Sequence, residues 1–166
     1  MIVMVAGIAG SGKTTVGELL AARLGWEFAD GDRFHSPAAV AKMHAGIPLT
    51  DDDRWPWLDA IGAWVDQENA AGRSAVVACS ALKRSYRQRL LTGRPELRMF
   101  FLVISHDADE ARLTGRHGHF FPEKLLDSQF ATLELPEPSE GVTLVPATGT
   151  PEQAVDEIVR DLAQPA

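Results

Sequence analysis

The chain has 166 residues, a net charge of −7 and a single cysteine. This length suits one domain that buries roughly 70% of its unfolded surface, and one cysteine cannot form an internal disulfide. The negative charge argues against a nucleic-acid partner, and no apolar run approaches the ~18 residues of a membrane span. We therefore expect a single domain over residues 1–166. Because Met1 leads directly into an apolar run without a basic leader, we expect that domain to be soluble and cytoplasmic.

The first predicted elements surround a glycine-rich turn. Residues 2–6 form an apolar run typical of a buried strand, and residues 15–24 carry apolar side chains at helical spacing. Between them, residues 7–14 read GIAGSGKT and fit the pattern G-x-x-x-x-G-K-[ST]. In such a loop, backbone N–H groups and the helix dipole hold phosphate, the lysine neutralises it, and the threonine hydroxyl ligates Mg²⁺. The predicted ATP site is Gly7, Ile8, Ala9, Gly10, Ser11, Gly12, Lys13, Thr14 and Thr15, with Lys13 catalytic and Thr14 a metal ligand.

An acid-rich loop follows a second predicted strand at residues 26–29, which comes after Gly25 as a helix C-cap. Asp30 and Asp32 should lie at the same sheet edge as the phosphate loop. Phosphoryl transfer to an alcohol needs a group that orients the hydroxyl and accepts its proton. We predict that Asp32 does this and that Asp30 faces the metal. The alternative is an Asx-type turn in which the acids only cap backbone N–H groups.

Two helices are predicted next. Ser36 and Pro37 are typical of a helix start, and this short helix should end near Gly46. A longer helix is expected from about residue 54 to 71, with Pro56 in its first turn.

Arg54, at the start of that longer helix, offers a planar fork that suits a substrate carboxylate. The acids Asp51, Asp52 and Asp53 before it are interpreted mainly as helix-start chemistry.

Residues 74–79 form the clearest buried strand, and basic residues follow it. If a helix begins near Ser80, Lys83 and Arg87 lie one turn apart and face the same way. We predict that they bind an anionic substrate, the alternative being a solvated basic face. Cys79 is expected to be an inert buried side chain.

Strands are also predicted at residues 97–104 and 141–145, with a last helix at 151–162. Strands that alternate with helices in this way indicate an α/β fold. We expect a doubly wound parallel sheet of about five strands, with ligands at the carboxyl ends of the strands.

A segment rich in arginine and glycine precedes the fifth strand. Arg112 and Arg116 share a helix face, and the glycines after them allow a hinge. We predict a helical lid over about residues 112–135, in which both arginines clamp the phosphates and stabilise the transferring group. The alternative is a pair of solvated arginines at a helix end.

Together these motifs resemble the gluconokinase family of carbohydrate kinases, and the resemblance covers about four-fifths of the chain. Its most selective strings are Asp53-Arg54-x-Pro56-Trp57 and Cys79-Ser80-Ala81-Leu82-Lys83, beside the phosphate loop. Further matches are Asp30-Gly31-Asp32 with His35, Tyr86-Arg87, Gly118-His119-Phe120-Phe121 and Gln129-Phe130-x-Thr132-Leu133-Glu134.

The resemblance implies ATP-dependent phosphorylation of D-gluconate at its 6-hydroxyl, with Mg²⁺, a core like that of nucleoside monophosphate kinases, and a homodimer. It also implies an adenine-contacting loop at residues 147–151, including Pro151. The expected gluconate-binding residues are Asp30, Asp32, His35, Arg54, Lys83, Arg87 and His119.

Two other functions remain open from the sequence. One is another phosphate-loop small-molecule kinase, such as a shikimate kinase or a nucleoside monophosphate kinase. The other is a regulatory module that binds ATP without transferring phosphate, although such a module would not need an acceptor pocket.

Overall fold

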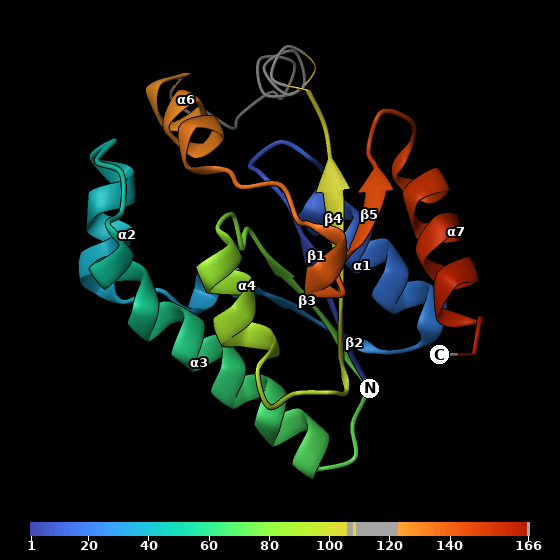
Figure 1. Cartoon of the computed structure of the whole chain (residues 1–166). Coiled ribbons are helices and arrows are strands. Elements are labelled where there is room, and N and C mark those ends of the chain that lie inside the picture. The colour runs from blue at the N-terminus through green and yellow to red at the C-terminus, as the bar shows by residue number, and fades with distance from the viewer. Residues whose placement is uncertain (106–107, 109–122, 166) are drawn as a thin grey trace.

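The structure is a computed structural model that describes residues 1–105, 108 and 123–165. In this part of the chain, five strands form one parallel sheet in the order β2-β3-β1-β4-β5 (Figure 1). The predicted doubly wound α/β sheet is therefore confirmed, with strand ends within two residues of those expected. The strands are β1 (Ile2–Ala6), β2 (Glu27–Asp30), β3 (Ala75–Cys79), β4 (Leu97–Val103) and β5 (Thr143–Pro146).

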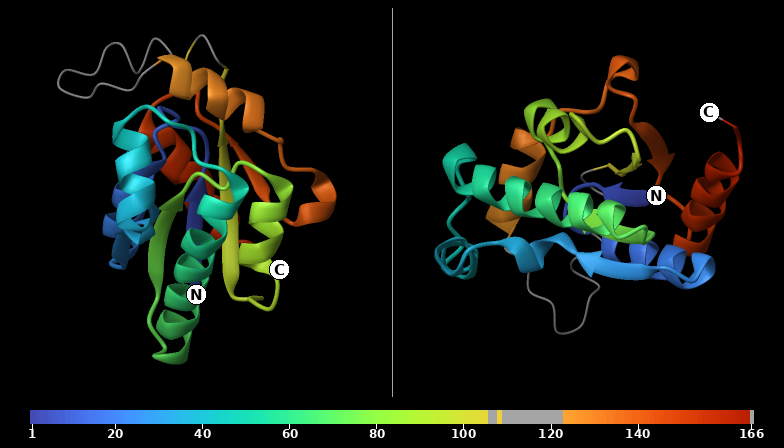
Figure 2. Two further views of the ribbon diagram at one scale, coloured as in Figure 1. Left: turned by 90° about the vertical axis from the view of Figure 1, so that its left-hand side faces the viewer. Right: turned by 90° about the horizontal axis from the view of Figure 1, so that it is seen from below.

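Helices cover both faces of the sheet. α1 (Lys13–Leu24) and α7 (Pro151–Leu162) pack on one face, and α3 (Asp51–Ala70) and α4 (Arg84–Leu91) on the other (Figures 1 and 2). The remaining elements are α2 (Pro37–His44), α6 (Glu123–Thr132) and the short 3₁₀ helices η1 (Gly31–Phe34) and η2 (Pro138–Glu140). α6 lies beyond the arrowheads of β4 and β5, where the strands end (Figure 1). Within the described ranges, none of the helices has the length and apolar character needed to cross a bilayer.

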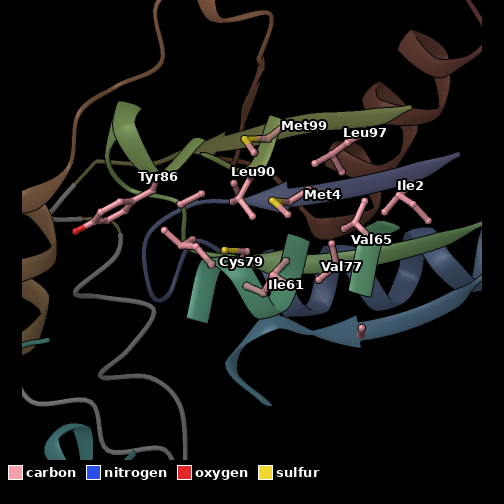
Figure 3. Packing of buried hydrophobic residues seen from close by; sticks show 14 of the residues in the cluster. Ile2, Met4, Ile61, Val65, Val77, Cys79, Tyr86, Leu90, Leu97 and Met99 are labelled. Atoms are coloured by element: carbon pink, nitrogen blue, oxygen red, sulfur yellow. The ribbon is translucent and has the colours of Figure 1, made fainter. Parts of the chain in front are cut away.

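The core is divided into two apolar clusters because successive side chains of a strand point to opposite faces. In β1, the even-numbered residues join the cluster under α3 and α4, and the odd-numbered residues join the cluster that includes α1 and α7. Figure 3 shows the first cluster, in which Ile61 of α3 and Leu90 of α4 lie near Met4 of β1. Cys79 belongs to it, and burial raises the pKa of its thiol to about 12, so this side chain stays protonated and inert as expected.

The long helix α3 begins three residues earlier than predicted. Thr50 is its N-cap: the Thr50 hydroxyl accepts from the Asp53 N–H, and the Asp53 carboxylate accepts from the Thr50 N–H. Pro56 therefore lies inside the helix rather than in its first turn. Asp53 also accepts a hydrogen bond of 2.8 Å from Lys42 of α2, and these hydrogen bonds lower the pKa of its carboxyl to about 2. The capping box thus ties α2 to the start of α3.

Helix α4 also departs from the prediction, because it begins at Arg84 with Lys83 as its N-cap. Arg87 is fully buried rather than exposed beside Lys83. Its Nε and Nη2 bind the carboxylate of Glu140 at 2.6 and 3.1 Å, and its Nη1 donates to two carbonyl oxygens. The prediction that Arg87 binds the substrate is therefore wrong: all three nitrogens of its guanidinium are engaged inside the protein.

The buried pair of Arg87 and Glu140 supports the turn that follows β3. The two carbonyls bound by Arg87 are those of Ala81 and Leu82, and Ala81 has a φ of +43°, in the left-handed region that a residue with a Cβ rarely adopts. The carbonyl of Ser80 in the same turn accepts from the Gly7 N–H at 3.3 Å. The ion pair thus holds the turn that contacts the phosphate loop.

We predict that Arg87→Met lowers the free energy of unfolding by about 3–5 kcal/mol, because it leaves the Glu140 carboxylate buried without its partner. Urea unfolding at pH 7 measures this. The matched control is Arg89→Met, which removes a pair with Asp59 whose side chains are 44% and 56% exposed, and which should cost about 0–1 kcal/mol. An equal decrease in the free energy of unfolding in the two variants would contradict a structural role for the buried pair.

The contribution of this buried pair also depends on pH. Arg87 lowers the pKa of Glu140, so the pair stabilises the fold above the unfolded pKa of a glutamate and this contribution is lost as pH falls through the folded pKa. The difference in the free energy of unfolding between wild type and Arg87→Met should therefore become smaller at acidic pH.

Candidate active site

A cavity of about 300 Å³ lies where the segments that follow β1, β2 and β3 come together. Its walls come from the phosphate loop, η1, the end of α2 with the loop that follows it, the start of α3, the turn after β3, and α6. The structure thus brings the acid-rich loop and the phosphate loop to one site. The lining residues that matter for chemistry are Ala9, Lys13, Asp32, His35, Arg54 and Gln129.

The phosphate loop joins β1 to α1, and glycine is required at its first position. Gly7 has a φ of +149°, and a Cβ there would lie 2.7 Å from Ser11 Oγ and 3.2 Å from the Leu102 carbonyl oxygen. Gly12, in the left-handed conformation, is the N-cap of α1, so the first N–H groups of the helix have no partner within it. This is the geometry that holds an anion at a helix N-terminus. Lys13, the first residue of α1, lines the cavity beside it.

The two acids after β2 have different surroundings. Asp30 caps η1, and its Oδ1 accepts from the Asp32 N–H at 2.9 Å, so the Asx-type turn exists for this residue. Asp32 is exposed and lines the cavity, and its carboxylate has no hydrogen-bond partner among the described residues. Of the two acids, Asp32 is therefore the one placed to meet a ligand.

The backbone between these acids is held tightly. A Cβ on Gly31 would lie 2.3 Å from the carbonyl oxygen of Ala78 in β3, so only glycine allows this close approach. Trp57 Nε1 donates to the Gly31 carbonyl at 2.8 Å. Asp32 is thus presented by a loop that is packed on the sheet and bound to α3.

His35 lies against Trp57, with ring centroids 4.2 Å apart and planes 15° from parallel. Burial lowers the pKa of His35, and the charge of Arg54 acts in the same direction while Asp32 opposes it. The ring is therefore neutral near pH 7. Its Nδ1 is buried and has no hydrogen-bond partner in the described part of the chain. A polar group at this position normally has a partner, so a ligand that supplies one would satisfy it.

Arg54 is held at the cavity by a chain of polar side chains. Its Nη1 donates to the Tyr86 hydroxyl at 3.0 Å, and that hydroxyl donates to the Asp51 carboxylate. The Tyr86 hydroxyl and then Lys83 lower the pKa of Asp51. Because only Nη1 of Arg54 has a partner among the described residues, its Nε and Nη2 are left for a ligand.

Lys83 reaches this site only indirectly. Its Nζ lies 3.0 and 3.2 Å from the two oxygens of Asp51, and Lys83 does not line the cavity. The structure thus places Lys83 near the predicted substrate site, but as a partner of Asp51. The sequence predicted no site role for Asp51 or Tyr86, because neither pairing follows from local spacing.

Gln129 was not predicted as a site residue, although it belongs to a matching string. It lies on α6 and lines the cavity, and its Oε1 accepts a hydrogen bond of 2.8 Å from the Ala9 N–H. The contact joins residues 120 positions apart, so only the family string could have drawn attention to it.

Several other predicted residues are not tested by this site. Arg112, Arg116 and His119 lie outside the described residues, as does the whole part of the predicted lid that precedes α6. Pro151 opens α7, after Thr150 as the N-cap, and does not line this cavity. The adenine contact at Pro151 stays a prediction.

The donor set suits a metal that arrives with a nucleotide. The described residues contain no group of three or more His, Cys, Asp or Glu side chains that could hold an ion. Nucleotide-bound Mg²⁺ needs only one or two protein ligands, because phosphate oxygens and water supply the rest. Thr14 at the start of α1 fits that requirement, and Asp30 keeps one carboxylate oxygen without a partner among the described residues.

Comparison with solved structures supports the fold. A gluconokinase from Sinorhizobium meliloti 1021 superposes with a TM-score of 0.86 at 43% identity, covering 97% of this chain and 90% of that one. A shikimate kinase from Aquifex aeolicus vf5 has a TM-score of 0.60 at 18% identity, covering 98% of this chain and 96% of that one, and shows the shared fold only.

Sequence comparison identifies the family. The pattern of a family described as an AAA domain matches residues 2–136. A gluconokinase from Gluconobacter oxydans (strain 621H) is 46% identical over 95% of this chain and 88% of its own length. The thermoresistant gluconokinase of Escherichia coli (strain K12) is 38% identical over 93% of this chain and 88% of its own length. With this extent of similarity and a phosphate loop beside the cavity, the chain belongs to the gluconokinase family.

Proposed function

We propose that this protein is a gluconokinase, which transfers the γ-phosphoryl group of ATP to the 6-hydroxyl of D-gluconate and releases 6-phospho-D-gluconate and ADP. The observation that carries this proposal is that one cavity is lined by Lys13, Asp32 and Arg54 together. These residues provide a cation for phosphate, a carboxylate for a hydroxyl, and a guanidinium for a carboxylate.

The phosphate end of the site uses the loop and α1. Lys13 and the N–H groups at the start of α1 hold the β- and γ-phosphates. Thr14, with Asp30 as a further candidate, would hold Mg²⁺, which neutralises phosphate charge when bound. Asp32 orients the 6-hydroxyl and accepts its proton as the oxygen bonds to phosphorus and the bond to ADP breaks.

The acceptor end matches a polyol that carries one carboxylate. Arg54 binds the carboxylate through the nitrogens left after its bond to Tyr86. The buried Nδ1 of the neutral His35 forms a hydrogen bond with a hydroxyl group of the acceptor and so gains a partner. Lys83 acts as a positioning residue, through Asp51 and Tyr86, rather than as a direct ligand.

Other properties are proposed from the sequence patterns and the family resemblance. These are a single domain over residues 1–166, a homodimer, a cytoplasmic location, phosphate contacts from Arg112 and Arg116, a gluconate contact from His119, and an adenine contact from Pro151.

An acceptor panel tests the function. Purified protein with ATP and Mg²⁺ should release ADP with D-gluconate, and not with shikimate or nucleoside monophosphates. ADP release with another acceptor instead would favour a different small-molecule kinase. ATP binding without ADP release in the presence of any sugar acid would favour a regulatory module.

We predict that Asp32→Asn lowers kcat by at least ~10², because the amide cannot accept the hydroxyl proton. Steady-state kinetics with saturating ATP and gluconate measures this. The control is Asp52→Asn, at an exposed position in the first turn of α3, which should keep near-normal kcat. Near-normal turnover of Asp32→Asn would remove Asp32 from the role of base.

We predict that Arg54→Lys raises the KM for gluconate by about tenfold or more and leaves the KM for ATP nearly unchanged. Lysine keeps the charge but loses the fork that can bind Tyr86 and a carboxylate together. The matched control, Arg89→Lys, alters a pair with Asp59 outside the cavity and should leave both constants unchanged. A larger increase in the KM for ATP than in the KM for gluconate would contradict the assignment of Arg54 to the gluconate carboxylate.

A further inference from the structure

Gln129 connects α6 to the phosphate loop at a point that faces the acceptor. Its Oε1 accepts from the N–H of Ala9, the third residue of the loop, at 2.8 Å. Both residues line the cavity that also contains Asp32, His35 and Arg54. The Ala9 N–H is therefore directed to a side chain beside the proposed acceptor position.

The segment that carries Gln129 is fixed at a second place. Just after α6, the Glu134 N–H donates to the Leu82 carbonyl at 2.9 Å, and Glu134 Oε1 accepts from the Arg84 N–H at 3.0 Å. Since α6 is bound to the phosphate loop at Gln129 and to the turn after β3 at Glu134, the Gln129 side chain is held in place before any ligand binds.

The hydrogen bond from the Ala9 N–H also fixes the orientation of the Gln129 side-chain amide. With Oε1 engaged, the Nε2 group keeps two N–H donors, and neither has a partner among the described residues. These donors are neutral, whereas the charged groups of a sugar acid and of ATP already face Arg54 and Lys13. A neutral donor suits the remaining chemistry of the acceptor, which is its hydroxyl oxygens.

We propose that Gln129 is a specificity residue for the acceptor: its Oε1 fixes the phosphate loop through Ala9 while its Nε2 donates to a hydroxyl oxygen of the bound sugar acid. This inference rests on the proposed function. One donor to one hydroxyl contributes about tenfold or more to acceptor affinity, because an unpaired polar group would otherwise remain in the site.

Gln129→Glu separates the two roles. The carboxylate still accepts from the Ala9 N–H but has no donors, so the KM for gluconate should rise at least tenfold, and by a larger factor than the dissociation constant of a non-hydrolysable ATP analogue, which the added negative charge also raises. Gln129→Met removes both ends of the amide and should weaken both ligands. The matched control is Gln67→Glu, the same change at an exposed position of α3, which should alter neither constant.

The pH profile provides a readout that a purely structural role would not move. Protonation of the carboxyl group introduced by Gln129→Glu removes its negative charge and restores one donor at this position. The ratio of the KM of that variant to that of wild type should therefore fall as pH is lowered towards ~5. Thermal unfolding of each variant checks that the fold is kept.

The possible outcomes are distinct. If wild type does not phosphorylate gluconate, the proposed function fails. If wild type does and Gln129→Glu has the same KM for gluconate, or a raised KM that does not respond to pH, this inference alone is overturned and Gln129 only supports the loop.

Discussion

The structure depends on the parallel pairing of β1 with both β3 and β4, which directs the carboxyl ends of these strands to one edge of the sheet. β2 pairs in the same direction on the far side of β3. The phosphate loop, the acid loop and the turn after β3 must therefore meet, although more than 40 residues separate β2 from β3 in the chain. Backbone contacts secure this arrangement further, such as the hydrogen bond from the Gly7 N–H to the Ser80 carbonyl.

Two arginines show how the same side chain serves different purposes in this fold. Arg87 has all its nitrogens engaged by Glu140 and two carbonyls, so it is a structural residue that supports a turn with an unusual backbone. Arg54 has one nitrogen engaged by a described residue, and it lines a cavity. Because a buried guanidinium needs partners for its charge, the number of internal partners separates the structural cation from the one available to a ligand.

The sequence predicted the elements whose signals are local. Strands buried on both faces are continuous apolar runs, and the phosphate loop carries its own pattern of glycines. The start of α3 was predicted too late because Pro56 was assigned to the first turn. The capping box of Thr50 and Asp53 is the stronger signal for the helix start. The structural role of Arg87 could not be predicted from its spacing to Lys83, because its partner Glu140 lies 53 residues away. Gln129 was missed for the same reason, as its contact with Ala9 joins distant parts of the chain.

Arg54 lines the cavity, whereas its charged neighbours Lys83 and Asp51 do not. Arg54 and Lys83 are two cations, and Asp51 between them is one anion, so the three groups together leave one positive charge. Burial keeps His35 neutral, so it adds no further charge near pH 7. Of these three groups, Arg54 is the one that lines the cavity, so it is the cation available to a carboxylate, whereas Lys83 and Asp51 compensate each other beside it.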